Sequence, residues 1–96
     1  MMVSNVSIFV EYKNLTTEHK ENVTCTRDHV RAVTVFDVME ENFNIVYEEF
    51  PNGYLITKIN GAGTSGWTFT IDGTFAGVAC NKQSVCNASV IRWTEK

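Results

Sequence analysis

Three Asx-Gly pairs divide the second half of this 96-residue chain into short segments: Asn52-Gly53, Asn60-Gly61 and Asp72-Gly73. Such pairs are a strong hairpin signal, because both central residues of a type I′ turn need positive φ, which Gly, Asn and Asp tolerate best. The runs around these turns are too short for ordinary helices. They therefore predict antiparallel strands, which we place at residues 45–49, 55–60, 67–72, 74–79 and 89–95.

Two further strands are predicted in the first quarter of the chain. In residues 4–12 the apolar side chains of Val6, Ile8 and Val10 are spaced two apart, which is typical of a half-buried strand. Residues 21–27 alternate in the same way after a polar stretch at 13–20. Together they indicate a hairpin with a long polar tip.

One short helix is predicted over residues 34–43. Thr34 is followed three positions later by Asp37, a pattern close to a capping box, and an apolar stripe that we expect in the core recurs at helical spacing. A hairpin, a helix and then more strands is an α+β order. We therefore expect a single small β-grasp-like domain over residues 1–96, with a mixed, mostly antiparallel sheet and one short helix.

Charge and hydropathy exclude several classes of function. Eight Lys and Arg against eleven Asp and Glu give a formal charge of -3, and no basic stripe is present to neutralise a phosphate backbone, so we expect no nucleic-acid partner. The apolar runs are far shorter than the roughly 20 residues that cross a bilayer. The first residues also lack the basic and apolar regions of an export signal, so we expect no membrane insertion.

Four N-x-Ser/Thr sequons favour an exported protein, at Asn5, Asn14, Asn22 and Asn87. The frequency of Asn and Thr in turns and strands is the alternative explanation for them. We expect Asn14, on the hairpin tip, to be the most exposed of the four and the most favoured for glycan attachment, followed by Asn87, with both residues in loops. The sequons predict an extracellular or cell-surface location, with the leader outside this sequence.

The three cysteines support the same compartment, since small exported domains gain most from a disulfide. Cys80 and Cys86 are separated by five residues, a loop that can bring two Cα atoms within bridging distance. We predict that these two are bonded and that Cys25 is free. A Cys25–Cys80 or Cys25–Cys86 bridge is the alternative.

Metal binding and catalysis are weakly indicated. Cys25, His29, Cys80 and Cys86 could nominally bind zinc, but their spacing is poor for a structural site, and nothing around Cys25 supplies a catalytic base. We expect no metal, no cofactor and no enzymatic activity.

The acidic pairs and the glycine-rich loop have simple structural explanations. Glu40-Glu41 and Glu48-Glu49 lack a calcium-loop pattern and are expected on solvated faces. The loop 61–66 lacks the lysine and the following helix of a phosphate loop, so we read it as a flexible connector.

The aromatic residues raise the main functional question. Trp93 shares a strand face with Ile91 and is expected in the core. Trp67 follows the glycine-rich loop, with Tyr54 and Phe75 as neighbours across hairpins, so it is a candidate contact surface for a ring-shaped ligand or a protein. Burial is the alternative, because alternation places Trp67 on one face with Phe69 and Ile71.

Four segments resemble, in order and spacing, the transcobalamin C-terminal-like domain family: "TVFDVM" (34–39), "NGYLITKINGAG" (52–63), "GWTFTIDG" (66–73) and "SVIRW" (89–93). The resemblance implies a β-grasp-like module. In vitamin B12 carriers such a module closes over the corrin face, while a separate helical domain supplies most of the pocket. No such helical domain is present in these 96 residues, and Ala88-Ser89 stands where the family commonly has Gly-Asp.

The resemblance also implies that Trp67 faces a ligand, as the matching tryptophan does in B12 carriers. We therefore predict a ligand-binding set with a partly exposed Trp67 at its centre; the set comprises Trp67, Tyr54, Phe75, Asn60 and Gly61. Cobalamin is one candidate ligand. The resemblance favours the function of a non-enzymatic extracellular module that binds a small-molecule ligand or a surface protein. The alternative is a structural or adhesion subunit of a glycosylated cell-surface assembly, in which strand edges pair between copies.

Overall fold

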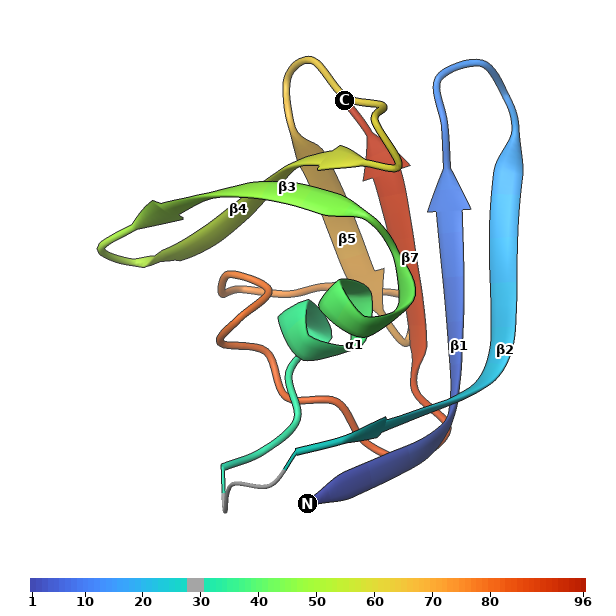
Figure 1. Ribbon diagram of the computed structural model, residues 1–96, viewed down its shortest axis with the longest axis vertical. Helices are drawn as coiled ribbons and strands as arrows, with labels where there is room; N and C mark the ends of the chain where they lie inside the picture. Colours follow the sequence, from blue (N-terminus) through green and yellow to red (C-terminus); the bar gives the residue numbers. More distant parts are fainter. Residues whose placement is uncertain (28–30) are drawn as a thin grey trace.

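The fold of residues 1–27 and 31–96, taken from a computed structural model, is a mixed sheet, a two-stranded sheet and one short helix (Figure 1). The elements are β1 (Met2–Glu11), β2 (Thr17–Thr26), α1 (Val35–Asn42), β3 (Ile45–Phe50), β4 (Gly53–Ile59), β5 (Trp67–Ile71), β6 (Thr74–Phe75) and β7 (Val90–Glu95). The predicted α+β class is confirmed. No helix in this part of the chain has the length and apolar character needed to span a membrane.

The last strand lies at the centre of the five-stranded sheet, whose order is β2-β1-β7-β5-β6. β7 runs parallel to β1 and antiparallel to β5, with Ile8 opposite Ile91 and Phe69 opposite Trp93. Alternation along β7 sends Ile91 and Trp93 into the core, where both are buried. The predicted core position of Trp93 is confirmed.

α1 begins at a capping box. The Thr34 hydroxyl accepts a hydrogen bond from the Asp37 N–H at 3.3 Å, and the Asp37 carboxylate accepts one from the Thr34 N–H at 3.0 Å. Both predicted capping residues are therefore confirmed, and they satisfy amide groups that have no partner within the helix. The apolar stripe of the helix, including Val35, Val38 and Met39, is buried in the core that it shares with the sheet.

The β3–β4 hairpin forms the second sheet and extends away from β1 and β2 (Figure 1). Ile56 and Ile59 of β4 are buried, whereas β3 is exposed along most of its length. Gly53 makes close packing possible at the start of β4, because a Cβ atom there would lie 2.3 Å from Ala79 Cβ. The chain after β6 can therefore pass directly against β4.

That packing explains why the strand predicted over 74–79 ends at Phe75. Beyond Phe75 the chain leaves the sheet and crosses to β4, where Asn81 Oδ1 accepts a hydrogen bond from the Tyr54 N–H at 2.9 Å. The Cys80 thiol donates to the Tyr54 carbonyl at 3.6 Å. The Asn81 and Cys80 side chains thus form hydrogen bonds with the backbone N–H and C=O groups of Tyr54, which a neighbouring strand could otherwise pair with.

The predicted Cys80–Cys86 disulfide is wrong. All three cysteines are free: Cys80 is buried against β4, and Cys86 is exposed in the loop before β7. The core position of Cys80 holds its sulfur away from the surface on which Cys86 lies. Cys25 is free, as predicted, and buried. His29, the fourth residue considered for zinc, lies outside the described residues.

Candidate functional site

A cleft of about 190 Å³ lies between β4 and β5. Its walls are residues 54–56 of β4, residues 67–69 of β5, and residues 75, 76, 79 and 80 along and after β6. Trp93 of β7 completes the lining. We call this hollow the β4–β5 cleft; it is the place where the second sheet meets the first.

Three of the five predicted ligand-binding residues come together in this cleft. Tyr54, Trp67 and Phe75 all line it, from three different strands. Phe75 is 73% exposed and forms the rim. Their role in binding stays a prediction, but their common location agrees with the hypothesis of an aromatic surface around Trp67.

The predicted partial exposure of Trp67 is wrong, because its side chain is 2% exposed. Its Nε1–H donates to the Ala62 carbonyl at 2.9 Å, and its ring packs edge-on against Tyr12. The glycine-rich loop therefore covers the indole instead of leaving it open. The burial expected from alternation with Phe69 and Ile71 is the correct alternative, although Trp67 still contributes to the cleft wall.

Asn60 and Gly61 lie away from the cleft. The Asn60 amide donates to the Tyr12 hydroxyl at 3.2 Å and to Glu18 at 3.0 Å, which ties the β4 end to the first hairpin. Asn60 and Gly61 both have positive φ, so they serve the turn after β4. Their geometry indicates a structural role.

Sequence reasoning missed much of the cleft wall, including Leu55, Ile56, Ala79 and Cys80. Cys80 was assigned to a disulfide and Trp93 to the core. Nothing in the spacing of these residues signals that β4 packs beside β5, since the two strands are not hydrogen-bonded neighbours in one sheet.

Gly63 allows the covering of Trp67. An added Cβ would lie 2.2 Å from the Thr57 carbonyl oxygen and 2.8 Å from Trp67 Nε1, at a φ of 139°. We expect Gly63→Ala to lower the free energy of unfolding by about 2 kcal/mol more than Gly61→Ala does. Gly61 is the matched control, because it also has positive φ but an added Cβ meets nothing within 4 Å. Equal losses in urea denaturation would contradict this packing.

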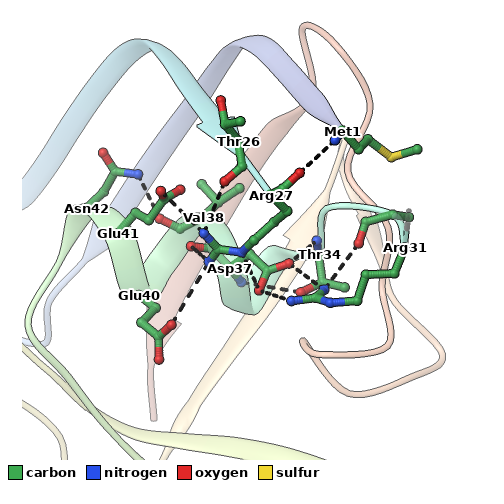
Figure 2. A network of polar contacts seen from close by, with 11 residues as sticks. Met1, Thr26, Arg27, Arg31, Thr34, Asp37, Val38, Glu40, Glu41 and Asn42 are labelled. Carbon is green, nitrogen blue, oxygen red and sulfur yellow. Dashed lines mark hydrogen bonds and ion pairs between the residues drawn. The ribbon is translucent and has the colours of Figure 1, made fainter. Parts of the chain in front are cut away.

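A second polar feature lies at the start of α1, where two arginines surround one buried carboxylate (Figure 2). Arg31 contacts both Asp37 oxygens, at 2.8 and 3.0 Å, and Arg27 Nε lies 3.1 Å from Oδ1. Arg27 also reaches Glu41 at 3.3 Å. The network joins the end of β2 to the helix, which gives it a structural role.

The ionisation of Asp37 follows from these contacts. Burial alone would raise the pKa of the carboxyl group, but the hydrogen bonds from Arg31, from the Thr34 amide and from Arg27 outweigh it. They hold the pKa of Asp37 well below its usual range. The helix start therefore contains a carboxylate that stays ionised.

The two buried cysteine thiols, Cys25 and Cys80, are unreactive at neutral pH. Burial, followed by the neighbouring Glu41 carboxylate, raises the pKa of Cys25 to about 12, and burial raises that of Cys80 to about 11. Both thiols are therefore protonated, and a protonated thiol is a poor nucleophile and metal ligand. In residues 1–27 and 31–96, no group of three or more His, Cys, Asp and Glu side chains is arranged to hold a metal ion.

The sequons lie on the surface. Asn14 is exposed at the tip of the first hairpin, as predicted, and its Oδ1 accepts a hydrogen bond from the Thr16 amide at 3.0 Å. Asn87 is exposed in the loop before β7, also as predicted. Asn5 and Asn22 are exposed within β1 and β2, where both have positive φ. Glycan attachment at these positions stays a prediction.

Comparison with known proteins identifies a family and a shared fold. The family described as a domain of unknown function (DUF4430) matches residues 32–96. Among curated proteins, no sequence matches significantly.

Two of the solved structures that share the fold are similar over nearly all of this chain. One, from Ruminococcus gnavus ATCC 29149, is described as a candidate metal-binding protein; the likeness has a TM-score of 0.75, 16% identity, and covers 96% of this chain and 94% of that one. The other is haptocorrin in complex with Cbi, with a TM-score of 0.74 and 22% identity, covering 99% of this chain and 25% of that one. This chain thus spans about a quarter of haptocorrin. The likeness supports the transcobalamin C-terminal-like fold that the sequence resemblance implied.

Proposed function

This chain belongs to the family described as a domain of unknown function (DUF4430), and we propose that it is a non-enzymatic extracellular module that binds a ligand in the β4–β5 cleft. The observation that carries the proposal is the meeting of Tyr54, Trp67 and Phe75 in one hollow. These are the aromatic residues that the sequence singles out for ligand contact. Ligand sites are typically concave and lined by apolar and aromatic side chains.

The structural neighbours support a binding role. Haptocorrin was solved with Cbi bound, and the Ruminococcus gnavus protein is described as a candidate metal-binding protein. The described part of this chain shows no cluster of metal-ligating side chains, so metal is not the ligand we propose. The protonated state of Cys25 and Cys80 supports a role without nucleophilic catalysis.

The exposed sequons support the proposed extracellular location. Asn14 and Asn87 stand in surface loops, where a transferase can reach them. We prefer the binding role to an adhesion role based on strand pairing, because the outer strand β2 carries charged side chains such as Glu18, Lys20 and Glu21. Charges along an edge strand oppose pairing between copies.

The test is a binding survey by ¹H–¹⁵N NMR with cyanocobalamin and a set of neutral, cationic and anionic fragments. We expect at least one compound to shift signals of residues 54–56 and 67–69. If no compound moves these signals at millimolar concentration, the binding function is wrong.

Phe75 provides the variant for this survey. We expect Phe75→Ala to weaken binding of the compound found by about five- to tenfold, because the ring forms the rim of the cleft. The thermal midpoint should stay nearly unchanged, since the ring is mostly exposed. Leu15→Ala, at the far hairpin tip and 94% exposed, is the control and should alter neither quantity. Unchanged affinity in Phe75→Ala would remove Phe75 from the site.

A further inference from the structure

The β4–β5 cleft presents mainly, though not only, apolar surface, and several of its residues carry polar groups. None of its described lining residues is charged. The Trp67 Nε1–H is used by the Ala62 carbonyl, and the Cys80 thiol by the Tyr54 carbonyl. These two donors are therefore turned to the protein and not to the hollow.

The other polar side-chain groups of the cleft lining also interact with the protein or are covered by it. The Thr68 hydroxyl donates to the Thr94 carbonyl at 3.5 Å, and the Tyr54 hydroxyl interacts with the Glu49 carboxylate, which raises the pKa of Tyr54. Trp93 Nε1 is covered, with under 1 Å² of accessible surface, and has no hydrogen-bond partner among the described residues. Among these side chains, a ligand in the cleft thus finds few polar groups to bond: the Thr68 hydroxyl keeps its acceptor lone pairs, and the unpartnered Trp93 Nε1–H is covered.

The volume of the cleft limits the size of the ligand. A volume of about 190 Å³ exceeds that of the apolar cavity of about 150 Å³ that is known in another protein to hold benzene, so one ring and a short substituent fit. A large macrocycle does not fit inside it. Burying an ionised group here without a partner would cost much of its hydration free energy.

We propose that the β4–β5 cleft binds a small neutral molecule through a single aromatic or aliphatic ring. This rests on the proposed binding function and specifies the ligand class of the same site. Trp67, Phe69 and Trp93 supply ring contacts, while Ala76 and Ala79 leave the space that the ring occupies. Selection then depends mainly on shape and neutrality, with few side-chain hydrogen bonds.

The experiment compares three probes that share one ring: benzyl alcohol, benzoate and benzylammonium at pH 7. We expect benzyl alcohol to bind with a dissociation constant of about 1 mM, measured from shifts of the Trp67 and Trp93 indole signals. The two charged probes should bind at least about tenfold more weakly, because each would be desolvated without a partner.

A matched pair of variants locates the binding. Ala76→Leu fills the cleft and should weaken benzyl alcohol binding at least about tenfold. Val78→Leu enlarges an exposed side chain outside the cleft lining and should leave the affinity unchanged. If Ala76→Leu does not fold, the pattern of wild-type signals moved by benzyl alcohol decides, with residues 54–56 and 67–69 expected to respond.

Three results would overturn the inference: charged probes that bind as tightly as benzyl alcohol, unchanged benzyl alcohol affinity in a folded Ala76→Leu variant, or shifts outside the cleft. If cyanocobalamin or a charged fragment binds and benzyl alcohol does not, this inference fails while the binding function stands. If no compound binds at all, it is the binding function that fails.

Discussion

Replacing Trp67 with alanine is expected to lower the free energy of unfolding by about 3 to 5 kcal/mol. The indole is 2% exposed, donates its Nε1–H to the Ala62 carbonyl and packs against Tyr12. Its removal would leave a large hollow continuous with the β4–β5 cleft and would remove one of the two hydrogen bonds that the Ala62 carbonyl accepts, leaving the bond from the Ile59 N–H. Urea denaturation followed by far-ultraviolet circular dichroism measures the loss.

Two control variants separate packing from hydrogen bonding. Trp67→Phe keeps an aromatic ring but removes the donor, so we expect a smaller loss than in Trp67→Ala. Phe75→Ala removes an exposed ring from the same cleft and should change stability little. A Trp67→Ala variant that keeps its unfolding midpoint while losing ligand binding would contradict burial and restore the idea of an exposed contact residue.

Replacing Asp37 with asparagine is expected to cost about 3 kcal/mol of stability, because it leaves the partly buried Arg27 guanidinium without its nearest carboxylate. The change also weakens the capping box at Thr34. Glu40→Gln is the matched control: Glu40 lies 4.0 Å from Arg27 but is half exposed, so its loss should be small. Equal effects of the two substitutions would show that the network is not centred on Asp37.

The same carboxylate predicts a pH dependence. Because the pKa of Asp37 is lower in the folded chain than in the unfolded chain, the ionised group stabilises the fold. This contribution is complete above the unfolded pKa of about 4 and is lost progressively as the pH falls below it. We expect wild-type stability to fall between about pH 4 and pH 2, and Asp37→Asn to lack this part of the loss. An unchanged profile in Asp37→Asn would exclude Asp37 as its source.

The candidate site was only partly predictable. Trp67 was identified because it follows the glycine-rich loop, and Tyr54 and Phe75 because they are aromatic neighbours across hairpins; the three do share one cleft. Asn60 and Gly61 were included because their motif resembles a known family, yet the Asn60 side chain bonds to Tyr12 and Glu18. Sequence spacing cannot distinguish a ligand contact from a contact between two hairpins.

The sequence by itself determined the local elements: the Asx-Gly turns at 60–61 and 72–73, the helix start at Thr34 and Asp37, and the alternation that buries Ile91 and Trp93. At Asn52-Gly53 only the glycine has positive φ. Each of these local elements depends on backbone preferences or on neighbours within a few residues. The tertiary structure alone decided that β7 lies between β1 and β5 and that the loop 61–66 covers Trp67. It also decided that the Cys80 thiol donates a hydrogen bond to β4 and forms no disulfide with Cys86. These outcomes depend on which distant segments pack together, and the free energy of that packing is shared among many side chains instead of residing in one motif.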